Sequence, residues 1–236
     1  KKDIKDPYRL DVYFTPSLNI ISKIESVEKR LCDFAECENA CSTSDAYLLQ
    51  PIIENRVFIE NNDYKIINTG TVSKYIDKWG IKEMTYLGNK YLFPVCSKNN
   101  FHKQFQNTYG KKANTPKLII KGLTLLDVCI DIKGDIIPGK STLVIKNDNA
   151  ILLKMLLAFL NSHLPSFYLK EKYSSMTYNG GITFTKDMFN EIPLPKFSEK
   201  ELTSFANLAD LQVLNHSKLQ SMSDNVYGLL KGDFKN

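Results

Sequence analysis

Short apolar runs separated by turn residues fill the middle of the chain. From Lys117 to Lys146 the residues are mostly Val, Ile, Leu and Thr, and Asp131 to Gly134 supplies turn residues between the two arms. This pattern predicts a strand, a second strand, a turn and a third strand. Ile182–Thr185 alternates as a further short strand before the extended exit Ile192–Pro195.

A helical pattern follows the first three of these strands. Asp148 or Asn149 can cap its start, because a short polar side chain accepts hydrogen bonds from the first free backbone amides. Pro165 lacks an amide donor and should kink or restart the helix. The apolar positions that predict this one long helix are Ile151, Leu152, Met155, Phe159 and Leu160.

Helices are also predicted on both sides of the sheet region. Residues 18–30 repeat an apolar residue at every third position, and Ser198 with Glu201 forms a capping-box-like start before a long apolar stripe. Strands are predicted within 31–37, 56–60 and 84–92. We therefore expect an α+β chain with mixed or antiparallel sheets, a long packed helix and flanking N- and C-terminal helices. Its expected parts are a connector with an amphipathic helix (1–30), a main domain (31–195) and a C-terminal helical segment (196–236).

Composition narrows the class of protein. The 236 residues are 43% hydrophobic, which is enough for a packed core, and the net charge is +5. That mildly basic balance permits a polyanionic partner without requiring one. The five cysteines show neither a disulfide framework nor the spacing of a zinc site, which favours a reducing, cytoplasmic compartment. The longest apolar run, Ile151–Leu160, is too short to span a bilayer, so no membrane partner is expected.

Catalytic motifs are missing from the sequence. Pro138-Gly139-Lys140-Ser141 is similar to the end of a phosphate-binding loop, but Asp135 stands where the first glycine is needed and a strand follows. Asp131 and Asp135 are better explained as turn residues than as nuclease ligands. His163 has no Ser or Asp constellation near it in the sequence. We therefore predict no catalytic residue and no metal site in this chain.

Basic and amide side chains are concentrated in a few segments that could contact nucleic acid. Ser97–Thr115 is rich in lysine and amides, a composition that suits base-edge and phosphate contacts and equally suits a solvated loop or a partly helical insertion. Residues 64–80 interleave aromatics with lysines, which fits base stacking but also fits an ordinary core. Lysines in and beyond the predicted turn, and the bare amides near Gly180, could approach phosphates.

The order and spacing of several pieces resemble a known family. The pieces are Lys117–Gly122, Asp131–Gly134 before Gly139–Thr142, Leu160–Leu164 leading to Phe167-Tyr168, Gly180–Ile182 and the closing Ile192–Pro195. They are similar to the C-terminal specificity domain of the TaqI-like adenine-N6 DNA methyltransferases, which also occurs in restriction enzymes that combine methylation with cleavage. In that family a Gly- and Thr-rich loop ending in an aromatic opens the domain; residues 39–47 keep the small polar residues and the aromatic but lack the glycines.

This resemblance implies a target-recognition domain over 31–195 that reads double-stranded DNA. The methyltransferase's catalytic tetrapeptide and glycine-rich cofactor loop are absent, so S-adenosylmethionine, and Mg²⁺ if a nuclease is fused, are expected in a methyltransferase or nuclease domain of the same parent polypeptide. The chain begins at Lys1 rather than Met, which predicts a fragment or a processed product. The expected DNA-binding residues are Thr43, Ser44, Lys74, Tyr75, Lys98, Lys103, Gln104, Lys111, Lys112, Lys121, Lys133, Lys140, Ser141, Asn179 and Gly180.

Two other functions remain open at this stage. The chain could be a protein-interaction module of a multi-subunit complex, docking other subunits through its C-terminal helix and aromatic surface without reading DNA sequence. It could also be a small enzyme of an unrecognised type, which a bound metal or nucleotide would reveal.

Overall fold

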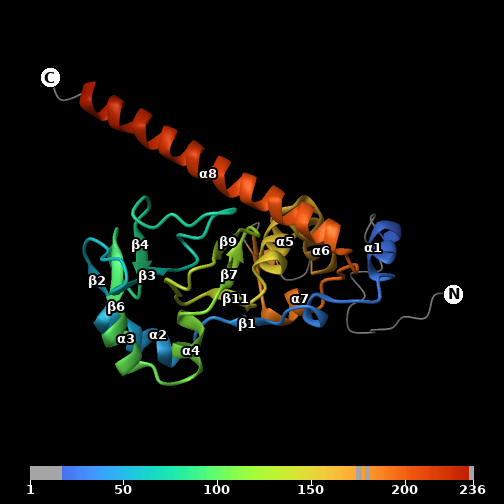
Figure 1. Ribbon diagram of the computed structural model, residues 1–236, viewed down its shortest axis with the longest axis horizontal. Helices are drawn as coiled ribbons and strands as arrows, with labels where there is room; N and C mark the ends of the chain where they lie inside the picture. Colours follow the sequence, from blue (N-terminus) through green and yellow to red (C-terminus); the bar gives the residue numbers. More distant parts are fainter. Residues whose placement is uncertain (1–17, 174–176, 179–180, 234–236) are drawn as a thin grey trace.

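The protein has an α+β fold built around two small four-stranded sheets (Figure 1). The computed structural model describes residues 18–173, 177–178 and 181–233. The first sheet has the order β1-β11-β7-β9 and is antiparallel throughout; its strands are β1 (Cys37–Asn39), β7 (Lys117–Lys121), β9 (Val128–Asp131) and β11 (Thr142–Lys146). The second sheet has the order β10-β3-β6-β2 and is mixed; its strands are β2 (Glu54–Asn55), β3 (Asp63–Ile67), β6 (Pro94–Ser97) and β10 (Ile136–Pro138).

Two minor sheets complete the described strands. A hairpin joins β4 (Met84–Tyr86) to β5 (Asn89–Tyr91), so the strand predicted within 84–92 consists of two short strands with a turn between them. The other minor sheet has the order β12-β13-β8, with strands β8 (Leu123–Thr124), β12 (Thr177–Tyr178) and β13 (Gly181–Thr183).

Helices are divided between the two sheets. The α-helices that pack around the first sheet are α1 (Leu18–Glu25), α5 (Ala150–Asn161), α6 (His163–Lys172), α7 (Lys186–Asn190) and α8 (Glu199–Asp233). Those beside the second sheet are α2 (Thr43–Leu49), α3 (Lys98–Gln104) and α4 (Thr108–Ala113). Two short 3₁₀ helices span Leu31–Asp33 and Gln50–Ile52. In Figure 1, α8 runs along the top of the molecule and its C-terminal half extends beyond the helices it packs on.

The predicted caps of α5 and α8 are confirmed, and a third helix, α7, begins with a cap of the same kind. Asn149 accepts hydrogen bonds from the amides of Ile151 and Leu152 at the start of α5. Thr185 caps α7, and Ser198 and Glu201 bond to each other's backbone amides at the start of α8. The predicted single long helix is interrupted at Ser162, three residues before Pro165, and α5 and α6 meet at an angle of 61°. No single helix within the described ranges is long and apolar enough to cross a membrane; the bent α5–α6 pair passes that test jointly, by length and composition.

Three sequence predictions of strands are wrong in detail. Residues 31–36 form a 3₁₀ turn and a loop, so the first strand begins only at Cys37. Residues 56–60 lie outside the strands, because the Arg56 guanidinium is held by Asp63 and Glu54 in a turn rather than in a ladder. The turn Asp131–Gly134 does not close a hairpin: β9 belongs to the first sheet, whereas β10 pairs in parallel with β3 of the second.

A buried ion pair fixes the crossing between the two sheets. Lys117, at the start of β7, is fully buried; its Nζ lies 2.6 Å from Oδ2 of Asp131 and also donates to the carbonyls of Ala113 and Thr115. Asp131 in turn accepts backbone hydrogen bonds from Gly134, Asp135 and Ile136. The carboxylate therefore shapes the turn that carries the chain from one sheet to the other.

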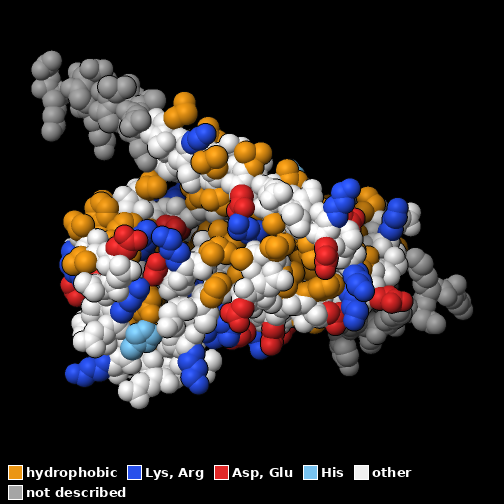
Figure 2. Space-filling view, in the orientation of Figure 1, with side chains coloured by type: hydrophobic (Ala, Val, Ile, Leu, Met, Phe, Trp, Pro, Cys, Tyr) orange, Lys and Arg blue, Asp and Glu red, His pale blue; other side chains and the backbone are white. Residues whose placement is uncertain are grey.

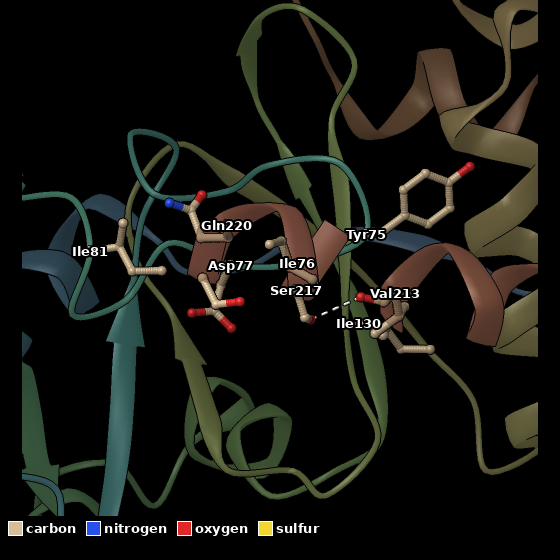
Figure 3. A pocket seen from close by; sticks show the side chains of 9 residues that line it. Tyr75, Ile76, Asp77, Ile81, Ile130, Val213, Ser217 and Gln220 are labelled. Carbon is tan, nitrogen blue, oxygen red and sulfur yellow. Dashed lines mark hydrogen bonds between the residues drawn. The ribbon is translucent and has the colours of Figure 1, made fainter. Parts of the chain in front are cut away.

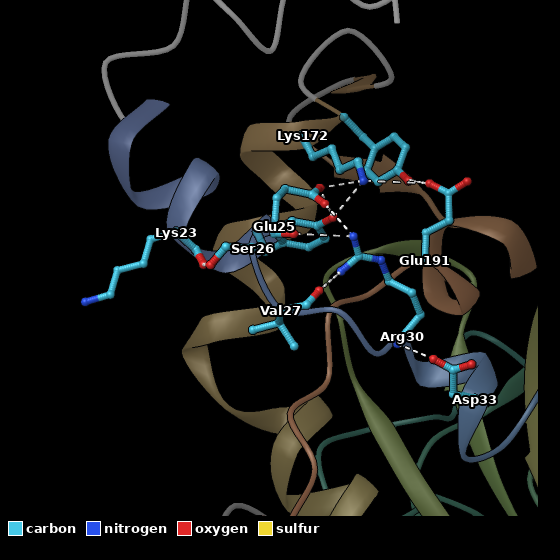
Figure 4. A network of polar contacts seen from close by, with 10 residues as sticks. Lys23, Glu25, Ser26, Val27, Arg30, Asp33, Lys172 and Glu191 are labelled. Carbon is cyan, nitrogen blue, oxygen red and sulfur yellow. Dashed lines mark hydrogen bonds and ion pairs between the residues drawn. The ribbon is translucent and has the colours of Figure 1, made fainter. Parts of the chain in front are cut away.

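A second polar network attaches α1 to α6 (Figure 4). Glu25 accepts hydrogen bonds from Lys172 (2.7 Å) and from Tyr168, and it forms an ion pair with Arg30 at 3.1 Å. Burial alone would raise the Glu25 pKa, but the hydrogen bonds from Lys172 and Tyr168 outweigh it and lower that pKa below the ordinary value of a glutamate. The N-terminal helix is thus fixed to the core by an ionised carboxylate.

Protonating Glu25 should weaken this attachment. A carboxyl group whose pKa is lowered by folding stabilises the protein above its unfolded pKa and loses that contribution as the pH falls through the folded value. We expect Glu25→Gln to lower the free energy of unfolding by about 1–2 kcal/mol at neutral pH and by less at about pH 3. Urea denaturation at both pH values measures this, with Glu28→Gln, an exposed glutamate of the same segment, as the control. An equal loss for Glu25→Gln at both pH values would contradict the account.

Candidate nucleic-acid interface

Three segments far apart in the sequence meet beside the second sheet. They are residues 39–50 with α2, residues 98–116 with α3 and α4, and the β10–β11 turn at 138–142. The amide of Ala40 donates to the Thr142 carbonyl at 3.1 Å, and the Tyr109 hydroxyl donates to the Pro138 carbonyl at 3.0 Å. Asn107 Nδ2 donates to Asp45 Oδ1 at 2.9 Å. We call this assembly, at the lower left of Figure 1, the α2–α4 face.

The α2–α4 face is basic. Its three segments contain Lys98, Lys103, Lys111, Lys112 and Lys140, whereas their one acidic residue is Asp45. Lys103, Lys111 and Lys140 are exposed and form no ion pair with the residues that the structure describes. Figure 2 shows lysines and a histidine at this lower corner, with the acidic side chains of that view lying elsewhere. The positive charge is therefore available to an external anion.

Asp45 is turned into the protein and does not cancel this charge. Its carboxylate accepts hydrogen bonds from the Ser42 amide at 3.1 Å, from Ser42 Oγ at 2.6 Å and from Asn107. Burial would raise the Asp45 pKa, but these hydrogen bonds lower it, so the group stays ionised and caps α2. It lines a polar hollow of about 350 Å³ between residues 39–42 of the α2 segment and residues 107–109 and Lys112 of the α4 segment.

The first turn of α2 presents Thr43 and Ser44 to solvent. The sequence favoured a polar loop over residues 39–47, and the structure corrects this to a helix from Thr43. Ser42 and Asp45 form a capping box, and the spacing of Ser followed by an acid three residues later is the signal that could have revealed it. One turn further, the Tyr47 side chain is 60% exposed beside this surface. Tyr47 is absent from the predicted site, although an exposed aromatic ring can stack on a base.

The β10–β11 turn presents Lys140 and Ser141. Gly139 donates to the Ile67 carbonyl at 2.7 Å, and Thr142 Oγ1 donates to the Gly139 carbonyl at 2.7 Å, so both ends of the turn are fixed. Ser141 adopts φ +63°, a left-handed conformation that L-residues seldom take. Its carbonyl accepts the Gly122 amide at 3.1 Å. Both side chains are exposed, as a phosphate contact requires.

Four of the predicted DNA-binding lysines bind partners within the protein, so their ammonium groups are less available to an external anion than those of Lys103, Lys111 and Lys140. The Lys74 ammonium group donates to the Asn161 carbonyl at 3.0 Å. The Lys112 ammonium group lies 2.8 Å from the Glu38 carboxylate and donates to the Asn39 carbonyl at 2.7 Å. The ammonium groups of Lys98 and Lys121 lie 3.1 Å and 3.4 Å from the carboxylates of Asp135 and Asp127. These contacts join residues distant in sequence, so composition could not reveal them.

Four further predicted residues lie in three different places. Gln104 is exposed next to Lys103 at the end of α3, within the α2–α4 face. Lys133 is exposed in the β9–β10 turn, 4.0 Å from Glu60 and outside the three segments of that face. Asn179 and Gly180 lie outside the described residues.

Tyr75 belongs to a second hollow, of about 370 Å³, between α8, β9 and residues 75–81 (Figure 3). The segment is not helical: Tyr75 has φ +68° and its ring lies 5.0 Å from that of His216 on α8. Trp79 packs edge-on against Phe58 and Phe93, which supports the core interpretation of that residue. Asp77 lines the hollow and accepts the Trp79 amide; burial raises its pKa.

Comparisons with known proteins do not assign a family. No protein-family model matches the chain, and no curated protein matches it. Within the described part of the chain, no group of three or more His, Cys, Asp or Glu side chains is arranged to hold a metal ion. The surface chemistry described above is therefore the basis for a functional proposal.

A glycine in α4 supports the shape of the α2–α4 face. A Cβ added to Gly110 would lie 1.8 Å from the Phe105 carbonyl oxygen, a backbone atom that cannot rotate away. We expect Gly110→Ala to shift α4 and to lower the free energy of unfolding by about 1–3 kcal/mol. Gly70→Ala is the matched control, because Gly70 is exposed and its added Cβ meets a side-chain atom at 3.2 Å. Equal stability of the two variants, measured by urea denaturation, would refute this role for Gly110.

Proposed function

We propose that the chain is the DNA target-recognition domain of a bacterial restriction–modification enzyme, an adenine-N6 DNA methyltransferase with or without a fused nuclease. In this proposal the domain binds duplex DNA, and the catalytic domain with its S-adenosylmethionine belongs to the same cytoplasmic parent polypeptide. The observation that carries the proposal is the α2–α4 face, where three exposed lysines form no ion pair within the described residues. The carboxylates at this face are already bound inside the protein: Asp45 by Ser42 and Asn107, Glu38 by Lys112 and Asp135 by Lys98. The family resemblance of residues 117–195 supports it independently.

The α2–α4 face suits DNA in two respects. Lys103, Lys111 and Lys140 can neutralise phosphates and release their counterions. Gln104, Thr43 and Ser44 are exposed donors and acceptors of the kind that contact base edges or phosphates. Because Lys103 lies on α3, Lys111 on α4 and Lys140 in the β10–β11 turn, the charge is distributed over a surface rather than along one strand or helix.

The rival function is a protein-interaction module. Leucines exposed along α8 favour it, because apolar side chains in water are typical of docking surfaces. The dependence of binding affinity on salt concentration distinguishes the two functions. Duplex binding through phosphates gives a logarithm of affinity that falls linearly with the logarithm of salt concentration, whereas apolar docking lacks that slope.

The test is a titration of a fluorescent random-sequence duplex with the chain at several salt concentrations. The proposal predicts binding with a slope corresponding to at least three phosphate contacts, roughly −3 or steeper. Absence of binding at low salt would overturn it and favour the interaction module. The third function, an enzyme of unrecognised type, would be indicated by a metal or nucleotide that co-purifies with the chain.

A further inference from the structure

A hollow beside α8 is built around a carboxylate (Figure 3). The hollow has a volume of about 370 Å³ and lies between α8, β9 and residues 75–81. Among the described residues that line it, Asp77 alone carries a charge. The Asp77 carboxylate accepts the Trp79 amide at 2.9 Å and forms no ion pair with the residues that the structure describes. We call this site the Asp77 hollow.

The charge of Asp77 is only partly balanced by its surroundings. Lys65 acts on it, but the Lys65 ammonium group lies over the rings of Trp79 and Phe58, 5.0 Å and 5.2 Å from their centroids. Asp131 acts on it with the opposite sign, and burial raises the Asp77 pKa because it disfavours the charged form. A cation bound in the hollow would therefore stabilise a carboxylate whose charge is incompletely compensated.

Two further polar groups of the hollow offer acceptors to a ligand. Ser217 Oγ donates its proton to the Val213 carbonyl at 2.8 Å, and Ser221 Oγ donates its proton to the Lys218 carbonyl at 2.8 Å. Each hydroxyl then has lone pairs, but no proton, left for a ligand. Together with the Asp77 carboxylate, these oxygens suit a positively charged ligand that has several N–H donors. They do not suit an anion such as phosphate, which needs donors from the protein.

Apolar side chains on both sides of Asp77 favour a flat, weakly hydrated cation. Figure 3 shows Ile81 on one side of Asp77, and Ile130 with Val213 on the other. An ammonium group is compact and strongly hydrated, so apolar surfaces that displace its water destabilise it. A guanidinium group is planar, is more weakly hydrated and carries five N–H donors. Its faces can contact the apolar side chains while its edge donates to the carboxylate.

The backbone that carries Asp77 is fixed in the folded protein. Tyr75 adopts φ +68°, a left-handed conformation that is costly for an aromatic residue. Its amide donates to the Val128 carbonyl at 2.8 Å, and the Lys78 amide donates to the Thr71 carbonyl at 2.8 Å. Strained backbone that is held by its surroundings is concentrated at ligand-binding and active sites. The segment therefore presents Asp77 to a ligand without rearranging.

We propose that the Asp77 hollow binds a guanidinium group, which donates hydrogen bonds to the Asp77 carboxylate. Ser217 and Ser221 accept from its remaining N–H groups, and Ile81 and Ile130 contact its apolar surface. The chemistry is the same for a free guanidinium compound and for an arginine side chain of a polypeptide, and the experiment below distinguishes these two sources. The site shares no residue with the α2–α4 face, so the inference goes beyond the proposed function.

Amide NMR of the whole chain tests the proposal, with N-acetylarginine amide as the probe. The Trp79 amide resonance should shift, because that amide donates to Asp77, and the shift should saturate with a dissociation constant of about 1 mM or tighter. The citrulline counterpart has the same shape without the charge and should bind at least about 10-fold more weakly. Butylguanidine distinguishes the sources. Affinity equal to that of the arginine probe indicates a free guanidinium compound, whereas binding about 10-fold weaker indicates an arginine whose peptide groups are also bound.

Three substitutions locate the site. Asp77→Asn keeps an acceptor for the Trp79 amide but removes the charge, so the affinity for N-acetylarginine amide should fall at least about 10-fold. Ser217→Ala, at an exposed residue, removes one acceptor and should weaken binding about threefold. Glu83→Gln is the control, because it removes the same charge from an exposed carboxylate two residues beyond Ile81, outside the hollow. It should leave the affinity unchanged.

Three results would overturn the proposal. They are a Trp79 amide resonance that does not shift at about 10 mM of the arginine probe, equal binding of the citrulline counterpart, and wild-type affinity in the Asp77→Asn chain. The amide spectrum of each variant verifies that the fold is kept, and the comparison of arginine with citrulline needs no variant at all. None of these outcomes depends on DNA binding, so the inference stands or fails separately from the proposed function.

Discussion

Replacing Asp131 by alanine should lower the free energy of unfolding by about 3–5 kcal/mol, the largest stability effect expected for a single substitution in this chain. The side chains of Lys117 and Asp131 are 0% and 3% exposed. Removing the carboxylate leaves a buried ammonium group without its counter-ion and three backbone amides without their acceptor. Since folded proteins of this size are stable by roughly 5–15 kcal/mol, this loss is a large fraction of the total.

The matched control for Asp131 is Asp127, which immediately precedes β9. Its carboxylate lies 3.4 Å from Lys121, the last residue of β7, and is partly exposed. Asp127→Ala should cost less than about 1 kcal/mol, because water screens and solvates that pair. Urea denaturation of both variants measures the difference. Lys117→Met together with Asp131→Asn should also cost less than the sum of the two single changes, because the residues form one unit. Additive losses would argue against a coupled pair.

Removing the three unpaired lysines of the α2–α4 face should have the largest effect on DNA binding. With Lys103, Lys111 and Lys140 all changed to alanine, we expect the salt slope to become shallower by about 3 and the affinity to fall about 100-fold at 0.1 M salt. In the proposed complex each substitution would remove one phosphate contact, and none removes an ion pair within the described residues. Fluorescence titration with a duplex at several salt concentrations measures both quantities.

A control for net charge is available elsewhere on the surface. Lys170, Lys196 and Lys200 are exposed and lie on or between α6 and α8, away from the α2–α4 face. Changing these three to alanine removes the same charge but should leave the slope within about one unit of wild type. If both triple variants lose affinity equally, binding follows net charge and the α2–α4 face has no special role.

Local chemistry was readable from the sequence because each signal and its effect lie within a few residues. Asn149, Thr185 and Ser198 cap helices where their side chains can reach free backbone amides. Ser42 and Asp45 carry the same kind of signal, but residues 39–47 are also similar to the small polar loop of the TaqI-like family, and that similarity favoured a loop. The α+β class followed from these local elements.

Contacts between residues distant in the sequence could not be predicted from such local signals. The turn at Asp131 has hairpin-like residues, but its course depends on Lys117 and on pairing of β10 with β3, some 70 residues earlier in the sequence. Likewise Lys74 is a residue of the type that contacts phosphates. Its ammonium group instead binds the carbonyl of Asn161, which is 87 residues away in the sequence. Whether a lysine is available to DNA is decided by such contacts, so the sequence could propose candidates but could not separate Lys103 from Lys112.

The central claim is that this chain reads DNA sequence, and selection from a random duplex pool tests it most directly. The chain is incubated with the pool at low and at moderate salt, and the retained DNA is sequenced. Our account predicts salt-sensitive retention and enrichment of one short motif, with the enrichment lost when Lys103, Lys111 and Lys140 are changed to alanine. Retention without any enriched motif at either salt concentration, or no retention at all, would contradict it.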